Sequence, residues 1–594
     1  MSETLHLGEP ADETDWRAMV EKGLKGAPWG RLVGKTADGL EIAPLYREPD
    51  YATAADVSGF PGAAPFTRGR AGWLIRQAYA HPDPARVNRD ILADLAGGVA
   101  AIELVIDPTG ARGVAITSAA DLDAALANVI LEAAPISLDG GGVAAARLLE
   151  AKLKGVAAPG TAFNLDLVWN ADAEAIAFAK RIRSELPNAT ALRADARPVH
   201  EAGGSEAQEI GAGLAAGLEA LRALTSAGVS IEDAAASLAF AMSVGPDVLV
   251  EAAKLRALRL CWARVMEASG AAPEAREARI HAFTSQRMLT RYDSYTNILR
   301  LSTAAFGAAV GGAHAISVAP FTDALGHASP FARRVARNTQ NVLMEECRLD
   351  HVADPAGGAW FVENVTRELA DKGWAVMQAI EAKGGMVAAL KAGALQAVVD
   401  EARAAREKLI ATRKETITGV TDFPSLDAAF PAFEPRAEAA PRGALAPIRW
   451  AAPFEALRDS AAASKARPSV FFANLASLAE FGPRAQWSRN LVAVGGASAL
   501  GAEDAYASID ALIDAFTKSG ARVALIASTD AVYAEQAENC AQRLKAAGAD
   551  WVLLAGKPGE SEDQLRAAGV DQFVYAGVNV LKELETLHAA LGIG

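Results

Sequence analysis

The chain has 594 residues, of which 51% are apolar, and its formal net charge is −14. At roughly 100–200 residues per domain, this length predicts more than one folded core, and the apolar content excludes a chain that is disordered throughout. The acidic balance argues against nucleic acid and against an anionic membrane surface as main partners, because both are bound through clustered Lys and Arg.

No targeting or metal-binding pattern stands out. The start of the chain lacks the basic and apolar stretches of a signal peptide, and no run of 18 apolar residues predicts a membrane span, so we expect a cytoplasmic protein. Cys261, Cys347 and Cys540 lie far apart and form no C-x-x-C pair. They predict free thiols, with neither a disulfide framework nor a metal site.

Residues 1–40 are of mixed polarity, with one amphipathic stretch at Trp16–Leu24. They are too few to form a domain, so we predict an arm that packs on the rest of the chain or on a partner.

Residues 41–420 alternate between short apolar runs and longer stretches with helical spacing. The helical stretches include Ala207–Thr225 and Val248–Met266. Such alternation over several hundred residues predicts a parallel α/β architecture, and at this length a (β/α)8 TIM barrel. The runs read as strands are Val99–Ile106, Ala134–Leu138, Ala162–Val168, Ser237–Val244 and Ala313–Val318.

Residues 421–465 are rich in Pro and Ala, which predicts an extended linker. Residues 466–594 then resume the alternation in compact form, with helical stretches at Asp504–Lys518 and Ala531–Ala547. This pattern predicts a flavodoxin-like, doubly wound domain. Its expected strands are Ser469–Asn474, Leu491–Val494, Val523–Ile526, Trp551–Leu554 and Gln572–Tyr575.

Three segments carry a resemblance to a known family: Arg291–Gly312 (RYDSYTNILRLSTAAFGAAVGG), Arg333–Glu346 (RRVARNTQNVLMEE) and Val352–Glu363 (VADPAGGAWFVE). In this order and spacing they resemble the barrel of adenosylcobalamin-dependent acyl-CoA mutases of the methylmalonyl-CoA mutase type. The resemblance implies a barrel that admits acyl-CoA along its axis, followed by a linker and a flavodoxin-like cobalamin domain.

The second domain departs from this family. Active members carry D-x-H-x-x-G after its first strand, and the His binds cobalt. The corresponding loop here, Ala473–Arg484, contains neither His nor Asp, and His588 is the only histidine of the domain. We therefore expect no cobalamin-binding and no metal-binding residue on this chain.

The barrel departs as well. Active members carry a Tyr-His pair shortly before E-A-G, but Arg197 and Pro198 occupy those positions here, and Ala78 stands where a Tyr follows I-R-Q. His200 is out of place in the motif and reads either as a substitute for the missing imidazole or as a polar loop residue. The family's substrate-carboxylate arginine has no clear match near residues 163–170. We therefore expect no catalytic residue.

One short sequence pattern of the family is retained in the barrel. Arg279 and His281 fall on an R-x-H pattern that contacts CoA in the active members. By this resemblance they are the candidate substrate-binding residues, although we read them mainly as inherited barrel architecture and take residual CoA contact as the alternative.

The resemblance implies the small, non-catalytic subunit of a heterodimeric methylmalonyl-CoA mutase. Adenosylcobalamin would be bound by the large catalytic subunit, and the complex would interconvert methylmalonyl-CoA and succinyl-CoA. One alternative is a divergent single-chain mutase with another lower cobalt ligand. A second is a cofactor-loading protein, which would be expected to carry nucleotide-binding motifs.

Overall fold

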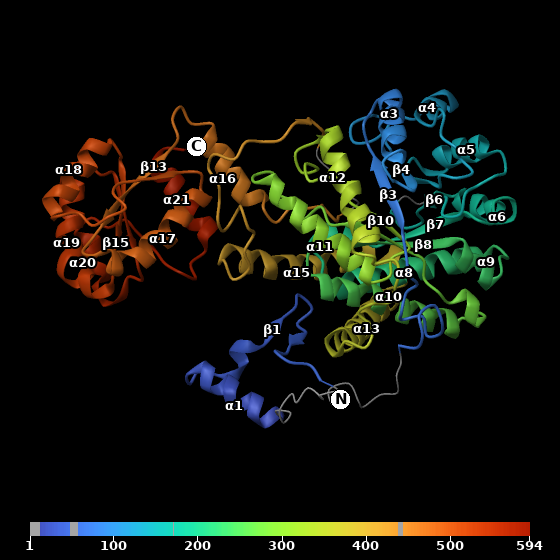
Figure 1. Ribbon diagram of the computed structural model, residues 1–594, viewed down its shortest axis with the longest axis horizontal. Helices are drawn as coiled ribbons and strands as arrows, with labels where there is room; N and C mark the ends of the chain where they lie inside the picture. The colour runs from blue at the N-terminus through green and yellow to red at the C-terminus, as the bar shows by residue number, and fades with distance from the viewer. Residues whose placement is uncertain (1–11, 48–57, 170–171, 438–443, 594) are drawn as a thin grey trace, which may run out of the picture.

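The computed structural model describes residues 12–47, 58–169, 172–437 and 444–593. They form a closed parallel barrel and a separate five-stranded parallel sheet, joined by a long connecting segment (Figure 1). The predicted fold class, a TIM-type barrel followed by a flavodoxin-like domain, is confirmed. Within the described ranges, every helix is too short or too polar to cross a bilayer.

The barrel is closed by hydrogen bonds between its last strand and its first, with Ala315 of β10 in register with Leu74 of β3. All of its strands run parallel, and the apolar runs predicted as strands fall on them. The strands are β3 (Leu74–Tyr79), β4 (Ala101–Ile106), β5 (Ile136–Gly140), β6 (Ala162–Leu165), β7 (Thr190–Asp195), β8 (Leu238–Val244), β9 (Ile280–Thr284) and β10 (Ala315–Ser317).

Helices surround the barrel, and α8 shows why they form where they do. Ser205 accepts a hydrogen bond from the N–H of Gln208, whose side chain bonds back to the N–H of Ser205, so a capping box starts the helix. The face of α8 that carries Ile210 meets α13 closely: a Cβ at Gly373 would lie 2.5 Å from a methyl of Ile210. The helices are α3 (Pro84–Leu95), α4 (Ala119–Ala125), α5 (Gly142–Leu153), α6 (Ala175–Glu185), α7 (Arg197–Glu201), α8 (Glu206–Ser226), α9 (Ile231–Ala236), α10 (Val248–Ala268), α11 (Asn297–Val310), α12 (Pro330–Asn341), α13 (Trp360–Glu381), α14 (Met386–Lys391) and α15 (Ala394–Ala411).

The second sheet has the strand order β14-β13-β15-β16-β17, so its first two strands exchange places as in flavodoxin-like folds. Its strands are β13 (Ser469–Asn474), β14 (Ser498–Leu500), β15 (Val523–Ala527), β16 (Trp551–Ala555) and β17 (Gln572–Val574). Its helices are α17 (Leu478–Val494), α18 (Ile509–Ser519), α19 (Asp530–Ala546), α20 (Glu562–Ala567) and α21 (Val580–Leu591).

One strand prediction in this domain is wrong. Leu491–Val494 forms the last turn of α17, and the second strand begins later, at Ser498. A short apolar run does not distinguish a buried strand from the buried end of a helix. Here Leu491 and Val494 are buried against the sheet from the helix side.

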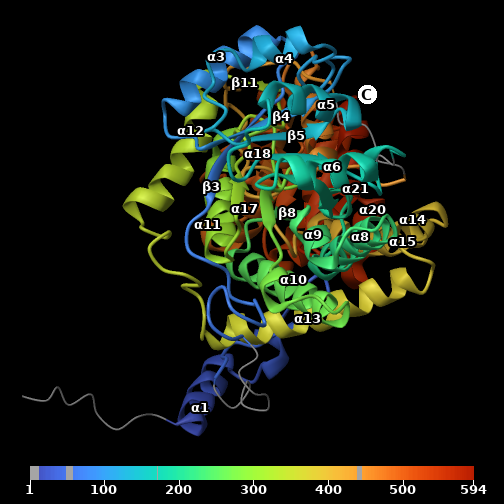
Figure 2. The ribbon, with the colours of Figure 1, turned by 90° about the vertical axis from the view of Figure 1, so that its right-hand side faces the viewer.

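The N-terminal arm projects from the rest of the molecule (Figures 1 and 2). It contains α1 (Glu13–Leu24), a short 3₁₀ turn at Trp29–Leu32 and β1 (Gly34–Lys35), and β1 forms a hairpin with β2 (Glu41–Ile42), which follows directly after the predicted arm. Asp38, in the turn of this hairpin, fastens the arm to the barrel by accepting hydrogen bonds from the Ser205 hydroxyl and the N–H of Ala207.

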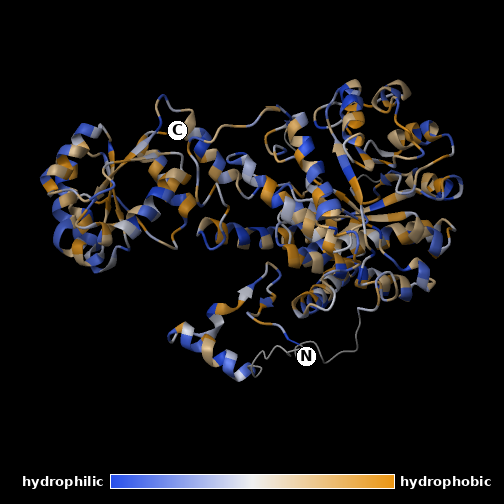
Figure 3. Ribbon diagram, viewed as in Figure 1, coloured by the Kyte–Doolittle hydropathy of each residue, from blue (hydrophilic) through white to orange (hydrophobic). Residues whose placement is uncertain are grey.

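The connecting segment crosses the carboxyl end of the barrel. Its strand β12 (Phe433–Glu434) pairs antiparallel with β11 (His327–Ala328), and we call residues 433–437 and 444–447 the strap. Helix α16 (Ala452–Ala462) lies within the range predicted as linker, so that part is helical and not extended. Figure 3 shows the apolar residues concentrated inside the two sheet domains, whereas α15 between them is largely hydrophilic.

Candidate functional site

Charged side chains occupy the interior of the barrel. Arg193 and Asp195 lie two residues apart on β7, so both face inward, where they meet Asp139 of β5. Nη2 of Arg193 lies 2.7 Å from Asp139 and 3.3 Å from Asp195. The side chain of Arg193 is 4% exposed and that of Asp195 is fully buried, whereas Asp139 is 13% exposed, so this ion-pair network is largely but not wholly buried.

Arg197, which stands in the predicted place of the family's Tyr, completes the network. Its guanidinium lies 3.1 Å from Asp139 and 2.7 Å from Asp195, and 4.1 Å from the centre of the Phe283 ring. Burial alone would lower the pKa of Arg197, but Asp139 and Asp195 together raise it well above its ordinary value. Arg197 therefore stays charged inside the barrel, where its carboxylate partners belong to this chain.

His281 points into the same interior from β9. Its Nε2 lies 2.9 Å from the Ser317 hydroxyl, which donates to Glu103 over 3.2 Å. Burial and the neighbouring Arg76 hold the pKa of His281 well below its ordinary value. Burial, with the charge of Asp139, raises the pKa of Glu103 to about 7. His281 is thus a neutral member of an internal hydrogen-bond chain.

Arg279, the other predicted substrate-binding residue, lies just before β9 at the amino end of the barrel. It is exposed, and its guanidinium donates to the carbonyl of Ala236 over 3.2 Å. The structure therefore does not bring Arg279 and His281 together: one is buried inside the barrel, and the other faces water outside it.

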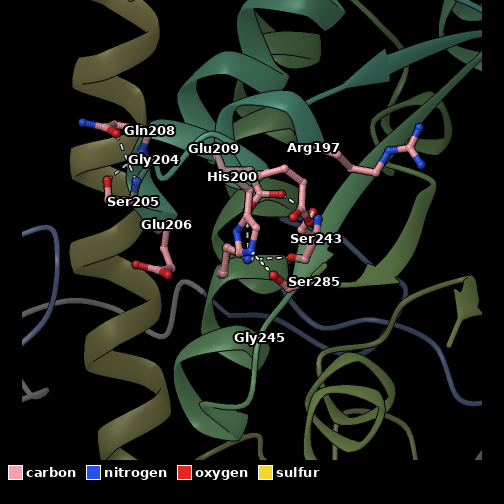
Figure 4. A network of polar contacts seen from close by, with 12 residues as sticks. Arg197, His200, Gly204, Ser205, Glu206, Gln208, Glu209, Ser243, Gly245 and Ser285 are labelled. Atoms are coloured by element: carbon pink, nitrogen blue, oxygen red, sulfur yellow. Dashed lines mark hydrogen bonds and ion pairs between the residues drawn. The ribbon is translucent and has the colours of Figure 1, made fainter. Parts of the chain in front are cut away.

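His200 lies in a second buried network, behind the carboxyl end of the barrel (Figure 4). Its Nδ1 lies 3.1 Å from Glu209 and its Nε2 lies 2.8 Å from the Ser285 hydroxyl. Burial, together with Arg287 and Lys254, keeps the pKa of His200 well below its ordinary value, so the neutral ring donates to Glu209 and accepts from Ser285.

The acid–His–Ser order of this network matches a hydrolase triad, but the surroundings do not. Ser285 is 1% exposed, so no substrate carbonyl reaches its hydroxyl. Glu209 is also paired with the fully buried Lys254 over 2.9 Å. Both ring nitrogens of His200 are therefore engaged by buried partners within this chain.

A cavity of about 440 Å³ opens at the carboxyl end of the barrel, where TIM-barrel enzymes hold their active sites. The strap partly covers it, since Glu434 pairs with Arg86 over 2.7 Å and Arg436 pairs with Asp323 over 2.8 Å. Pro198 and Arg197 form part of its floor. Arg86, Arg197 and Arg436 are thus already neutralised by carboxylates of the chain.

The second domain does not fit a histidine-ligated cobalt. Between β13 and α17 the chain runs through Leu475, Ala476 and Ser477, and Ser477 with Glu480 forms the capping box of α17. His588 is buried on α21, where its Nε2 donates to the carbonyl of Gly495 over 2.7 Å. Within the described ranges, no three His, Cys, Asp or Glu side chains converge on a point that could hold a metal ion.

Sequence reasoning missed the ion-pair network of Asp139, Arg193 and Asp195. A signal was present: charged residues two apart in an otherwise apolar strand, as in T-A-L-R-A-D at residues 190–195, share one face. Facing into a barrel, such residues need partners, and the structure supplies them as Asp139 and Arg197.

Comparison with known proteins agrees with these observations. The family described as Methylmalonyl-CoA mutase matches residues 35–158 and 166–452. The methylmalonyl-CoA mutase small subunit of Streptomyces virginiae is 40% identical, over 98% of this chain and 97% of that protein. The small subunit from Propionibacterium freudenreichii subsp. shermanii is 35% identical over 98% and 95%.

A relative that is not named as a small subunit matches less of the chain. The methylmalonyl-CoA mutase of Cereibacter sphaeroides is 32% identical over 69% of this chain and 64% of its own length. The similarity to the small subunits, by contrast, covers both domains. This chain therefore belongs to the methylmalonyl-CoA mutase family and is one of its small subunits.

Proposed function

We propose that this chain is the non-catalytic partner of a large catalytic subunit, which binds adenosylcobalamin and acyl-CoA. The observation that supports this most is the charged barrel interior: Asp139, Arg193, Asp195 and Arg197 pair with one another on the axis along which the family admits its substrate. A negatively charged acyl-CoA would have to displace paired charges that are largely buried, at a cost of several kcal/mol.

The second domain supports the same assignment of the cofactor to the partner. Its loop after β13 offers no imidazole, and His588 is already bonded to Gly495. In this proposal the complex interconverts methylmalonyl-CoA and succinyl-CoA, and this chain contributes its folded surface. We also propose that the chain is divided into an arm (1–40), a barrel domain (41–420), a linker (421–465) and a degenerate cobalamin-type domain (466–594).

The arm is the part of this chain that we propose to hold the partner. Helix α1 has no buried residue, and Met19 is 72% exposed. An isolated helix of 12 residues is marginal in water, so contacts from outside the chain would stabilise it. Binding there would in turn stabilise the complex by mass action.

The experiment is to purify this chain alone, the large subunit alone, and both together, and to measure mutase activity and corrinoid absorbance on each. We expect activity and corrinoid only where the large subunit is present. This chain isomerising a CoA ester by itself, or binding corrinoid by itself, would contradict the proposal and favour a divergent single-chain mutase.

CoA contact at Arg279 remains a separate proposal, since that guanidinium is exposed at the amino end of the barrel. His281 is buried and engaged with Ser317, so we propose no contact there without a local opening. A CoA titration of the chain tests this: Arg279→Gln should weaken binding several-fold, whereas Arg264→Gln, on the outer face of α10, should leave it unchanged. Equal binding by both variants would remove Arg279 from consideration.

A further inference from the structure

Two histidines lie where the strap meets the carboxyl end of the barrel. His327 is on β11, and its neighbour across the strand pair is Glu434 of β12. His81 follows β3, and its ring centre lies 5.2 Å from that of His327. Both histidines line the cavity of about 440 Å³ that the strap partly covers, and the proposed function assigns no role to either.

Glu434 joins the strap to the barrel at this point. Its carboxylate lies 2.7 Å from Nη1 of Arg86, on α3, and 3.5 Å from Nε2 of His81. The ring of His81 is itself held in place, since its Nδ1 accepts a hydrogen bond from the N–H of Asp83 over 3.1 Å. The closed strap therefore depends on one carboxylate that has a cation and an imidazole on its barrel side.

The charges around His327 are balanced while its ring is neutral. Arg86 is paired with Glu434 over 2.7 Å. Arg436 of the strap is paired over 2.8 Å with Asp323, which lies shortly before β11. A proton on His327 would add a positive charge for which these two ion pairs provide no further carboxylate.

The surroundings of His327 oppose this proton. Burial, with Arg436 and His81, lowers the pKa of His327 to about 4. Glu434 and Asp323 offset only part of this effect. An imidazole in water has a pKa of about 6.5, so the closed strap binds the proton less tightly than an open strap does. Closure is therefore favoured above about pH 6.5 and is lost progressively as the pH falls toward about 4.

We propose that the strap is an acid-sensitive cover of the barrel cavity: protonation of His327 separates β12 from β11 and exposes the cavity to solvent. Strand β12 has 2 residues, so few backbone hydrogen bonds hold the pair, and a change in side-chain charge is enough to open it. Every group involved belongs to this chain, so the opening requires neither substrate nor the large subunit.

The test is hydrogen–deuterium exchange of the full chain at about pH 7.5 and about pH 5.5. It is read as protection factors for the amides of β11 and β12, which correct for the intrinsic effect of pH on exchange. In the parent, protection should be about threefold to tenfold lower at the acidic pH. His327→Asn cannot take up the proton, so its protection should be nearly the same at both pH values.

A second variant separates the ion pair from the histidine. Glu434→Gln removes the carboxylate that Arg86 binds, so it should lower the protection of β11 and β12 already at about pH 7.5. Because His327 is still present, the further loss of protection at about pH 5.5 should remain.

The matched control is His351→Asn, which removes an exposed histidine of the barrel domain outside the strap and should follow the parent at both pH values. The amides of β8, inside the barrel, report whether the whole domain is destabilised and should stay protected. Equal protection of β11 and β12 at both pH values in the parent, an unchanged loss in His327→Asn, or a parallel loss in β8 would overturn the proposal.

Discussion

The interior of the barrel and the carboxyl edge of the second sheet are the two places where parallel strands of this fold could hold a ligand. In the barrel, Arg193 and Arg197 are paired with Asp139 and Asp195, and these charged side chains lie beneath a cavity of about 440 Å³. At the second sheet a cavity of about 700 Å³ stays open between aromatic rings. The comparison teaches that the strands provide only the position of a site, whereas inward side chains decide whether it is available.

The largest expected effect concerns a buried charge of the barrel. Lys254 is fully buried and pairs with Glu209 over 2.9 Å and with Glu251 over 2.5 Å. Lys254→Met leaves carboxylates without a partner in a dry environment, so we expect the free energy of unfolding to fall by about 3–5 kcal/mol. Urea denaturation followed by circular dichroism measures this.

Its counterpart in the second domain is Lys545, which pairs with Asp571 over 2.7 Å with both side chains more than a quarter exposed. Lys545→Met should cost less than about 1 kcal/mol, because water screens the pair. Equal losses of unfolding free energy in Lys254→Met and Lys545→Met would show that the burial of the ion pair does not determine its contribution to stability.

The next effect depends on pH. The pKa of Glu103 is raised to about 7 by burial, so the folded chain binds this proton more tightly than the unfolded chain does. Stability is therefore lost as pH rises from about 4.5 to about 7. Glu103→Gln should remove that loss. Its free energy of unfolding at pH 8 should therefore exceed that of the parent by an amount on the order of 1–3 kcal/mol.

Thermal unfolding at several pH values checks this prediction. The two chains should converge well below pH 4.5, where Glu103 of the parent is protonated in both states, and Glu132→Gln, on an exposed loop, should follow the parent throughout. A Glu103→Gln variant that is less stable than the parent at pH 8 would show that the ionised carboxylate is stabilising.

A smaller effect is expected at the strap. Arg436 pairs with Asp323 over 2.8 Å and donates to its carbonyl over 2.6 Å, with both side chains largely buried. Arg436→Gln should lower the local stability of β11 and β12 by about 1–2 kcal/mol, seen as faster amide exchange there. The control Arg467→Gln breaks an exposed pair with Asp427 and should leave those amides unchanged.

The smallest effect on the chain itself is expected at the arm. Met19→Asp changes a residue that is 72% exposed, so the unfolding of the isolated chain should shift by less than about 0.5 kcal/mol. Binding of the large subunit, measured by biolayer interferometry, should weaken tenfold or more if α1 packs on that subunit. Unchanged binding would place the interface elsewhere.

Much of the fold could be predicted from sequence, because strand and helix periods are local. The strand Ser469–Asn474 was predicted with its observed bounds, whereas Leu491–Val494 was assigned to a strand because apolar runs of that length fit both element types. The sequence alone also shows that no histidine follows β13 in the loop where the family carries its cobalt ligand.

The candidate sites were predicted less well. Arg279 and His281 are neighbours in sequence, but one is exposed and the other is buried with Ser317, and this depends on where the strand begins. The pairing of Asp139 with Arg193 joins residues 54 apart in sequence, which no local pattern reveals. The aromatic cavity likewise depends on rings from three separate segments.

The ion-pair network inside the barrel also constrains how this lineage can evolve. Replacing Arg197 alone would leave Asp139 and Asp195 with too little positive charge in a largely buried space, and replacing Asp139 alone would do the opposite. Each single step toward an open axis therefore passes through a poorly folding intermediate, although several steps together would not. Once these charges have paired, single substitutions that would reopen the barrel axis destabilise the fold and are therefore selected against.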